Sequence, residues 1–503
     1  MRPLHRTPIR RALAGTAAAL LLAGCGASVA SDTTGTTSTA SASSTSTVTA
    51  SDATTVDDAL ADDVAVETGD TAYDEADATV VTLSGTSASS DSDAVTIADG
   101  TVTITAAGTY VLSGDLAGQV VINSAGDVRL VLDDATIASG TTSAVDVVDA
   151  QSVVVVLADG STNALTDATT YDDTSDEAPT GALYSTADLT IGGSGSLTVT
   201  GNTNNGIVGK DGLVITGGTI EVTSVDDGII GKDYLVLTDG TVTVDSTGDA
   251  VTSDNTEDAG AGFVLIEGGD LTVTTQDDGI KGVQVLVAGG TIAVAGSNEA
   301  LEGSLIIVDD GDIELHSADD GVNVATSDDS AATDGQGGMG GEMAADTSLH
   351  LVINGGTLEV WSSGDGLDSN GDATITGGDI TVYGPTTDGN GALDVNGTFE
   401  VTGGTLMAAG TSGMMVAPST DSAQGWIAAA LSTTAAAGSE VVIADDSGAQ
   451  VATYTIAKDF TSVVFSSPDI EQDATYTVTV DGTPTEVTAG VAPAGGHGGP
   501  MGG

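Results

Sequence analysis

The chain has 503 residues, and its 73 Asp and Glu residues against nine Lys and Arg residues give a formal net charge of −64 at pH 7. This balance excludes nucleic acid as a partner, because no basic surface is present to neutralise phosphates. It also excludes direct electrostatic attraction to other anionic polymers. The single cysteine excludes an internal disulfide.

Residues 1–24 have the pattern of a secretory signal peptide. Four arginines, among them Arg10 and Arg11, precede an apolar run over 12–23 that is too short to span a bilayer. The tetrapeptide 22–25 (Leu-Ala-Gly-Cys) resembles a bacterial lipobox. We expect cleavage before Cys25 and lipid attachment to it, which would anchor the protein at the outer face of the cell membrane. A buried lone thiol and a twin-arginine signal are the alternatives.

Residues 25–79 are predicted to be a disordered tether. From Ser31 to about Thr55 the chain is almost only Ser, Thr, Ala and Asp, a composition that cannot bury a core. Residues 57–77 continue the segment with more acidic character. A lipid anchor followed by a tether suits a domain held away from the membrane.

Short alternations of apolar and polar residues, typical of strands, begin near Val80. They recur over 95–97, 102–104 and 110–112, with turn dipeptides at 99–100 and 107–108. We interpret 80–190 as the N-terminal cap and first coils of a solenoid, whose open sheet edge must be covered. The acidic insertion Thr162–Thr180 predicts a solvated loop, with a metal-binding loop as the alternative.

A repeated phrase organises residues 189–406. Each unit has two short apolar strands separated by Gly-Gly or Asp-Gly, as turns with positive φ require, followed by a third short element. The first apolar residue of the second strand recurs at Leu197, Ile220, Val242, Leu271, Ile292, Ile313, Leu358, Ile380 and Leu406. The steps between these positions are 23, 22, 29, 21, 21, 45, 22 and 26 residues, so the base period is about 21 to 22 residues.

This period, with apolar alternation inside each unit, predicts an all-β solenoid. About 22 residues at roughly 3.3 Å each give a perimeter near 70 Å, enough for three short faces and their corners. One unit is therefore one coil of a parallel β-helix, predicted over 80–412. The leucine-rich repeat signature is absent, calcium-binding nonapeptide repeats have too short a period, and propeller blades are about twice as long.

The repeat stops after Leu406. Alternating strands over 439–443, 451–456, 462–465 and 476–480 predict a small antiparallel β module, at 413–490, that closes the C-terminal end. Residues 491–503 are expected to be a disordered tail. The Gly- and Met-rich insertion 325–348 has a spacing that fits no defined metal site.

The third element of each unit places an acidic residue at one position of the coil. Aligned on the apolar residue that follows, this position reads Asn205, Asp227, Asp249, Asp278, Glu299, Asp320, Asp365 and finally Gly391. Two carboxylates stacked at about 4.8 Å repel by roughly 1 kcal/mol in water, and by several-fold more at a partly buried site. Cations between the coils would remove that cost. The alternative is an acidic surface that only solvates the protein, which does not explain why acids recur at one position.

A second polar row lies directly after the apolar anchor of the third element. It reads Lys281, Glu302, Asn323, Asp368 and Asp394. Two adjacent rows on successive coils can supply four oxygens to one ion, which suits calcium. The strongest stretch is 365–372 (Asp-Gly-Leu-Asp-Ser-Asn-Gly-Asp), although Asp-x-Asn-Gly is also a good turn sequence. The predicted metal ligands are Asp226, Asp227, Asp249, Asp277, Asp278, Glu299, Glu302, Asp319, Asp320, Asp365, Asp368, Asn370 and Asp394.

Lys210, Lys232 and Lys281 lie just after the acidic position and are the predicted polar carbohydrate contacts. They would bind a sugar carboxylate or act as a base. The alternative is that they are local counter-charges to neighbouring acids, namely Asp211, Asp233 and Glu302. The first two lysines lie three residues after the apolar anchor and the third lies one residue after it, which argues against a single basic line.

The phrase Gly-Gly-Thr-(Ile/Leu)-x-Val … Asp-Asp-Gly-Ile-x-Gly, with Gly-Asp-Gly-Leu-Asp-Ser-Asn-Gly at 364–371, resembles the bacterial family of carbohydrate-binding domain-containing proteins. The resemblance covers roughly 80–485, including 458–468 in the terminal module. It implies a right-handed parallel β-helix related to polysaccharide lyases, several bound calcium ions, and binding to cellulose and to acidic plant polysaccharide such as polygalacturonate. Carried over by position, it implies calcium ligands at Asp277, Asp278, Glu299, Glu302, Asp319, Asp320, Asp365 and Asp368.

We therefore expect a monomeric cell-surface lipoprotein that binds polysaccharide through a calcium-loaded carboxylate ladder. Trp361 follows Val360 and should point outward, as a sugar platform or as a structural residue. The rival hypothesis is a calcium-dependent pectate-type lyase, in which Lys232 or Lys281 removes the uronate α-proton, although no arginine near the ladder can neutralise the uronate. The third hypothesis is a structural adhesin without glycan specificity.

Overall fold

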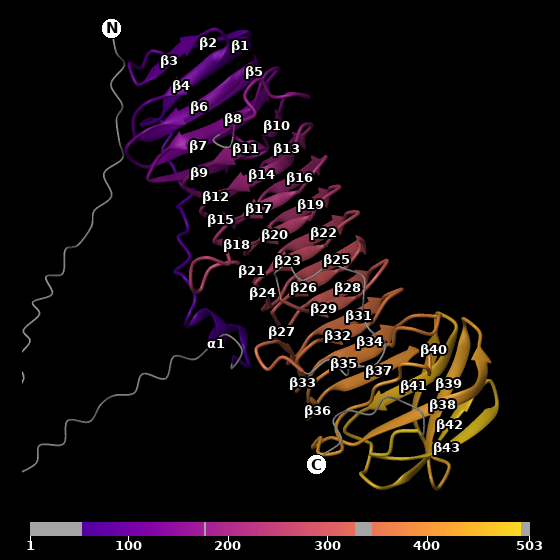
Figure 1. The fold of residues 1–503 in the computed structure, drawn as a ribbon. Coiled ribbons are helices and arrows are strands. Elements are labelled where there is room, and N and C mark those ends of the chain that lie inside the picture. The colour runs from indigo at the N-terminus through magenta and orange to yellow at the C-terminus, as the bar shows by residue number, and fades with distance from the viewer. Residues whose placement is uncertain (1–52, 176–177, 327–344, 494–503) are drawn as a thin grey trace, which may run out of the picture. The chain divides into compact units, whose positions relative to one another are not determined.

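The computed structural model describes residues 53–175, 178–326 and 345–493 (Figure 1). The predicted leader, Cys25, the first part of the tether, the centre of the 325–348 insertion and the last part of the tail lie outside the described residues. The described chain is almost entirely β, and its strands stack coil upon coil into three parallel faces. Among the described helices none is long and apolar enough to cross a membrane.

Each coil contributes one strand to each face, and we name the faces A, B and C in chain order. Face A contains β9 (Ser152–Leu157), β12 (Asp188–Gly193), β15 (Gly212–Ile215), β18 (Tyr234–Leu237), β21 (Phe263–Ile266), β24 (Gln284–Val287), β27 (Leu305–Val308), β30 (His350–Ile353), β33 (Asp372–Ile375) and β36 (Phe399–Val401). Face B contains β10 (Thr162–Thr166), β13 (Ser196–Gly201), β16 (Thr219–Ser224), β19 (Thr241–Asp245), β22 (Asp270–Thr274), β25 (Thr291–Gly296), β28 (Asp312–His316), β31 (Thr357–Trp361), β34 (Asp379–Tyr383) and β37 (Thr405–Gly410).

Face C carries the third strand of each coil. It contains β4 (Thr101–Ile104), β6 (Gln119–Asn123), β8 (Val145–Asp149), β11 (Gly181–Ser185), β14 (Asn205–Gly209), β17 (Ile229–Gly231), β20 (Val251–Ser253), β23 (Ile280–Gly282), β26 (Leu301–Gly303), β29 (Val322–Val324), β32 (Leu367–Ser369) and β35 (Leu393–Val395). At the N-terminal end, the long strands β5 (Gly108–Ala117) and β7 (Val128–Ala138) continue from face A into face B. The antiparallel pairs β1 (Thr79–Gly85) with β2 (Ser87–Ser89) and β3 (Val95–Ala98) with β4 begin the stack.

The predicted repeat register is confirmed coil by coil. Ile220 on face B pairs with Leu197 of the preceding coil and Val242 of the following one. The same in-register pairing continues through the remaining predicted anchor positions as far as Leu406. These residues point inward and form one continuous apolar core along the stack. The parallel β-helix predicted from the period is therefore the observed fold.

Glycines turn the chain from face A to face B. Gly218, Gly240 and Gly290 occupy equivalent corners with φ of +95°, +108° and +89°. This left-handed region is unfavourable for residues with a Cβ, so the recurring Gly-Gly and Asp-Gly pairs are required by the corner itself. The corner fixes where each face B strand begins and therefore helps to hold the register.

Face A differs from face B because its strands are buried on both sides. On face B, Ile220 and Val222 are buried and Glu221 between them is exposed. On face A, Val236 and Leu265 point away from the core, yet both are buried in a second apolar cluster. A strand that is apolar at every position indicates burial on both faces, so another part of the chain must cover face A.

That cover is the strap, which we define as residues 53–78. Its helix α1 (Val56–Leu60) packs Val56 and Ala59, which are 3% and 2% exposed, onto the outer residues of face A. The strap then runs back along face A toward the N-terminal coils (Figure 1). Hydrogen bonds fix it along the way: Val56 N donates to Asp309 Oδ2 (2.9 Å), Glu67 N to Tyr234 Oη (2.9 Å), and Gly69 N to Thr190 Oγ1 (2.8 Å).

The prediction of a disordered tether is wrong for residues 53–78. The acidic composition concealed a few apolar side chains that suffice to close a preformed groove, because the solenoid supplies the rest of the core. The outer positions of face A follow the extent of the strap. They become polar at Thr374 and Glu400 in β33 and β36, the last two coils of face A, and Glu400 is exposed.

The C-terminal end is closed by antiparallel strands. The inner pair is β38 (Trp426–Ala435) with β41 (Phe460–Ser466), and β41 also pairs with β37 of the last coil. The outer sheet is β40 (Gln450–Ile456), β39 (Ser439–Asp445), β42 (Thr475–Val480) and β43 (Thr483–Thr488). Lys458 Nζ donates to the carbonyls of Ser362 and Tyr383, and so ties this module to the side of the β-helix. The pairing with β37 covers an edge that would otherwise invite aggregation.

The strap can be tested with one buried valine. Val56→Asp should detach α1 from face A and lower the free energy of unfolding by about 2 kcal/mol, the value of burying one such side chain. It should also increase the fluorescence of a dye that binds exposed apolar surface. Val80→Asp is the matched control, because Val80 is 57% exposed. Equal effects of the two substitutions would show that the strap does not cover face A.

Candidate functional site

The two predicted polar rows are real columns on face C. The inward anchors Ile229, Val251 and Ile280 pair in register, and this pairing continues to Leu393. We define the first column as the residues two positions before these anchors, namely Asn205, Asp227, Asp249, Asp278, Glu299, Asp320 and Asp365. We define the second column as the residues directly after the anchors, namely Thr252, Lys281, Glu302, Asn323, Asp368 and Asp394.

Side chains of the first column also accept hydrogen bonds from the backbone of the next coil. Asp227 Oδ1 accepts a hydrogen bond from the backbone N–H of Asp249 at 2.9 Å, and Asp320 Oδ1 accepts one from Asp365 N at 2.6 Å. Asn205 makes the same contact to Asp227 N at 3.0 Å. A short side chain with an oxygen is therefore needed at this corner to satisfy the next coil. The sequence analysis missed this role, although the asparagine among the acids was a signal for it.

Burial makes the first column electrostatically costly, as the spacing predicted. It raises the pKa of Asp227 and Asp365 to about 6, and of Asp249, Glu299 and Asp320 to about 7, with neighbouring carboxylates as a further cause in each case. Bare carboxylates in this column would therefore take up protons near neutral pH unless a cation lies beside them.

One cation is built into the middle of the column. Lys281 Nζ lies 2.8 Å from Asp278 Oδ2, 2.9 Å from Glu302 Oε2 and 4.0 Å from Asp249 Oδ2. Burial alone would lower the pKa of Lys281, but its hydrogen bond to Asp278, the charge of Asp249 and its hydrogen bond to Glu302 together raise it above the ordinary value. Lys281 is thus a protonated counter-charge, as the alternative interpretation of this residue held.

The other two lysines lie apart from this cluster. Lys232 pairs with Asp254 of the next coil, Nζ to Oδ1 at 3.1 Å, rather than with the predicted partner Asp233, because the coils stack directly and bring the later residue closer. Lys210 is exposed. The three lysines do not form one basic line.

The tightest acidic groups in the described chain lie around Lys281. Carboxylate oxygens of Asp249, Asp277 and Asp278, and again of Asp278, Glu299 and Glu302, come within 4.8 Å of one another. The ammonium of Lys281 already contacts three of these five acids. A metal ion here would therefore compete with a tethered positive charge.

The columns continue toward the C-terminal end without such a lysine. Among the described residues, no lysine or arginine forms an ion pair with Asp320, Asp365 or Asp368. Burial raises the pKa of Asp368 to about 8, and the charges of Asp320, Asp394, Asp365 and Glu299 add to this shift. We call this part of the two columns, from Glu299 to Asp394, the cation section.

An amide in the cation section has an oxygen without a partner. Asn323 Nδ2 donates to Glu299 Oε2 at 2.7 Å, but Asn323 Oδ1 is buried and accepts no hydrogen bond from any described residue. In the second column Asn323 pairs with Glu302 on one side and Asp368 on the other. Carboxylate and amide oxygens are the donors that calcium prefers, so these residues fit a hard divalent cation.

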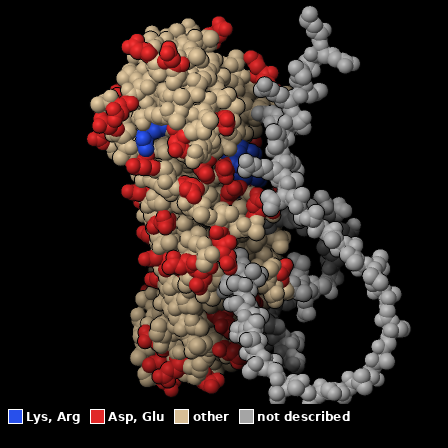
Figure 2. Space-filling view, turned by 90° about the vertical axis from the view of Figure 1, so that its left-hand side faces the viewer, with Lys and Arg blue, Asp and Glu red and all other residues tan. Residues whose placement is uncertain are grey.

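The remaining predicted ligands lie at the edges of the columns. Asp226, Asp277 and Asp319 each precede a first-column residue and are exposed at the corner. Asn370 lies in the turn after β32, where its Oδ1 accepts a hydrogen bond from Asn396 Nδ2 at 3.0 Å. Acidic side chains are also scattered over the molecular surface beyond the columns (Figure 2).

Trp361 belongs to a different feature, at the end of the face B strands. Its ring stacks on His316 of the preceding coil (5.4 Å between centroids, 13° between planes) and lies 4.4 Å from Tyr383 of the following coil. Its Nε1 donates to Glu359 Oε1 at 2.7 Å. Because rings from both neighbouring coils contact Trp361, one stacked and one tilted by 45°, the geometry favours a structural role over a flat sugar platform.

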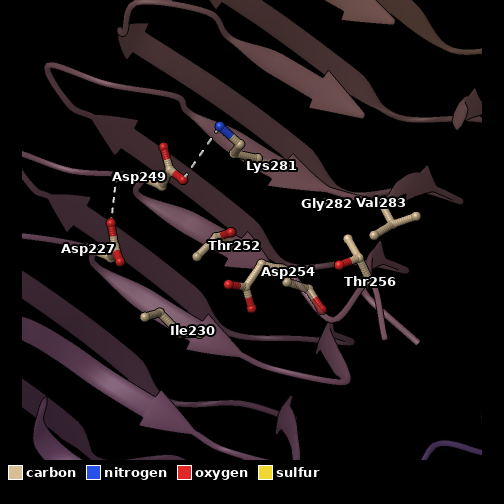
Figure 3. A pocket seen from close by; sticks show the side chains of 10 residues that line it. Asp227, Ile230, Asp249, Thr252, Asp254, Thr256, Lys281, Gly282 and Val283 are labelled. Atoms are coloured by element: carbon tan, nitrogen blue, oxygen red, sulfur yellow. Dashed lines mark hydrogen bonds and ion pairs between the residues drawn. The ribbon is translucent and has the colours of Figure 1, made fainter. Parts of the chain in front are cut away.

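A pocket of about 220 Å³ lies beside the N-terminal part of the columns (Figure 3). Asp227, Asp249 and Lys281 line one side, Asp254 and Thr256 in the turn after β20 line the other, and Thr252 lies between them. This pocket was not predicted. Its wall comes from one of the three stretched steps of the repeat, which was the available signal.

The pH dependence of stability should reveal the carboxylates whose pKa is raised in the folded state. Because the folded state raises the pKa of Asp249, Glu299 and Asp320 to about 7, their protonated forms stabilise the fold below about pH 4, and this stabilisation is lost as pH rises through about 7. In EDTA, the thermal unfolding midpoint should therefore decrease as the pH rises from about 4 to about 7, and Asp320→Asn should make this decrease less steep. The exposed Asp245→Asn is the control, and an equal slope in both variants would contradict the assignment.

Lys281 should contribute more to the free energy of unfolding than a surface lysine does. Lys281→Met leaves Asp278 and Glu302 without their cation and should cost about 3 kcal/mol of unfolding free energy in EDTA at pH 7, as expected for breaking a buried ion pair. Lys232→Met removes an exposed pair and should cost less than about 1 kcal/mol. Chemical denaturation measures both values, and similar costs would show that Lys281 does not neutralise the column.

Comparison with known proteins identifies the family of this chain. The family model described as "Carbohydrate-binding domain-containing protein" matches residues 98–389, more than half of the chain. A protein of that name from Acetivibrio thermocellus is 43% identical over 197 residues, which cover 38% of this chain and 69% of the relative. A solved structure of a polysaccharide lyase-like protein from C. thermocellum, a gadolinium derivative, is 30% identical, with coverage of 45% of this chain and 96% of the other and a TM-score of 0.40. The chain belongs to the family of carbohydrate-binding domain-containing proteins.

Proposed function

We propose that this protein binds acidic polysaccharide through calcium ions held in the cation section of face C. The observation that carries the proposal is the stack of half-buried carboxylates around Asp368, with no lysine or arginine paired to Asp320, Asp365 or Asp368 among the described residues. The family membership supplies carbohydrate as the class of ligand.

Charge decides how an acidic glycan can be held. The chain has a formal net charge of −64, so a polyuronate approaching face C meets carboxylates of its own sign. Calcium between the coils would neutralise the columns and leave coordination positions for uronate oxygens, because calcium accepts six to eight oxygen ligands. The periodic spacing of the columns, about 4.8 Å per coil, also suits a polymer that presents carboxylates repeatedly.

The donor set favours calcium over softer metals. Asp320, Asp365 and Asp368 offer only carboxylate oxygens, and Asn323 Oδ1 offers a buried amide oxygen that accepts no hydrogen bond within the described chain. Zinc and copper sites use imidazole or thiolate, which this section lacks. When bound, calcium would supply positive charge and open coordination positions. The side chains would fix where these positions lie.

The lyase hypothesis is weaker than binding. A lysine must be neutral to act as a general base, whereas Lys281 lies among three carboxylates that hold its ammonium form. Lys232 is ion-paired with Asp254, on the same face. We therefore propose binding without catalysis.

The same proposal places the protein outside the cytoplasm. The leader pattern at 1–24 and the lipobox-like Cys25 support a lipid-anchored surface protein, in which the stretch 26–52 separates the anchor from the strap. A surface location would bring face C into contact with external polysaccharide and with millimolar calcium, the range in which extracellular calcium modules bind.

The proposal predicts the behaviour of a single carboxylate variant. Wild-type protein should be retarded in a native gel containing polygalacturonate with calcium and should migrate freely with EDTA. Asp368→Asn should weaken calcium binding in calorimetry at least about tenfold, or about 1.4 kcal/mol, and should reduce the retardation. Asp245→Asn, which removes an exposed carboxylate from face B, should behave as wild type.

Two results would separate the remaining hypotheses. Retardation that persists in EDTA, or in Asp368→Asn at equal calcium, would contradict cation-bridged binding. Calcium binding without any retardation by polygalacturonate would instead favour the structural adhesin hypothesis, with the cation section acting as a calcium-dependent spine.

A further inference from the structure

The pocket beside the N-terminal part of the columns has features that the calcium proposal does not use. Its volume of about 220 Å³ would hold about seven water molecules, which is close to the space of one sugar ring. It opens on face C between the turn after β20 and the strand β23 (Figure 3). Its position on the same face as the cation section would allow one glycan chain to contact both.

The outer wall of the pocket is held rigidly. The longer coil inserts residues 254–262, and Asn255, only 4% exposed, clamps them. Asn255 Nδ2 donates to Asp233 Oδ1 (2.5 Å) and Asp258 Oδ2 (3.0 Å), while its Oδ1 accepts from the backbone of Glu257 and Asp258. The strap braces the same loop, because Val64 N donates to the carbonyl of Gly260 at 2.8 Å. A preformed wall lowers the entropy that a ligand must lose on binding.

The charges around the pocket determine what it can accept. Lys281 is already engaged by three carboxylates, and Lys232 by Asp254. The lining therefore presents negative charge to a ligand, with no uncommitted lysine among the lining residues. A uronate would be repelled here, whereas a neutral sugar can donate hydroxyl hydrogens to the carboxylates of Asp227 and Asp254.

The rest of the lining suits a sugar ring as well. The hydroxyls of Thr252 and Thr256 can both donate and accept hydrogen bonds. Ile230 and Val283 add small apolar surfaces on which the C–H side of a ring can pack. A few polar groups around an apolar patch are typical of pockets that orient a small ligand.

We propose that this pocket is a subsite for one uncharged sugar unit, distinct from the calcium-bridged binding of uronates. This inference rests on the proposed function in that both treat face C as the glycan-binding face. It adds the place where a neutral unit binds, at this pocket, by direct hydrogen bonds that need no metal ion.

The test separates the pocket from the cation section. Uncharged hexasaccharides of the gluco, xylo and manno series are titrated into the protein in EDTA by isothermal titration calorimetry. Wild type should bind at least one of them with a single site per chain. Thr252→Phe fills the pocket from its floor and Thr256→Trp fills it from the exposed wall, and each correctly folded variant should bind at least about tenfold more weakly. Thr243→Trp, on the exposed side of face B, is the matched control.

Either of two results would overturn the inference: no hexasaccharide binds wild type in EDTA, or the filled variants bind as Thr243→Trp does. The retardation by polygalacturonate with calcium is measured on the same proteins. It should survive in Thr252→Phe and Thr256→Trp, since neither substitution touches the cation section. If wild type shows no calcium-dependent retardation, the proposed function is contradicted. If wild type shows retardation but binds no hexasaccharide, only the subsite is contradicted.

Discussion

The in-register stacking of coils is the constraint on which the rest of the structure depends. Each backbone hydrogen bond between coils places a side chain about 4.8 Å from its equivalent in the next coil. A residue type that recurs with the period therefore becomes a column. Inward columns of Ile, Leu and Val make the core, a corner column of glycines makes the turns, and the columns on face C gather carboxylates. Both the stabilisation by the apolar columns and the repulsion within the acidic columns therefore increase with the number of coils.

The acidic column shows how this cost is distributed. Short side chains such as Asn205, Asp227 and Asp320 satisfy the backbone of the next coil, so a structural demand keeps an oxygen at these corners. Around Lys281 one ammonium within the chain offsets part of the resulting charge. Around Asp368 no described lysine or arginine does so, and there the raised pKa of Asp368 and the unsatisfied Asn323 oxygen coincide. One part of the column thus has its own positive charge, and the other part has carboxylates that a cation would stabilise. Metal binding is therefore expected in one part of the column and not along its whole length.

Periodicity allowed the sequence to predict whatever the repeat itself determines. The anchor positions from Leu197 to Leu406 and the acidic alignment from Asn205 to Asp365 all appear in the observed register, because a one-residue slip would turn the whole apolar set outward. The strap could not be predicted in this way, because residues 53–78 have no repeat and their composition resembles a disordered segment. The uninterrupted apolar strands of face A, such as β21, were the only sign that a cover was needed.

Contacts between residue types that do not recur along the solenoid account for the rest of what was missed. Lys232 pairs with Asp254 through the stacking of adjacent coils, not with its neighbour in sequence. Trp361 contacts rings from the preceding and following coils. The pocket depends on an inserted loop clamped by Asn255. These contacts follow the stacking of the coils, and both Lys232 with Asp254 and Asn255 with Asp233 are 22 residues apart. Their residue types do not recur from coil to coil, however, so a pattern of recurring residue types does not contain them.

The most direct test of the account is anomalous diffraction from crystals grown with calcium. The account predicts an anomalous peak between the coils of β29, β32 and β35, with oxygens of Asp368 and neighbouring column residues at about 2.3–2.6 Å from the ion. It also predicts weak or no signal where Lys281 contacts Asp278 and Glu302. Carboxylates around Asp368 that pair through protons or water, with no peak at saturating calcium, would contradict the central claim that this section holds calcium.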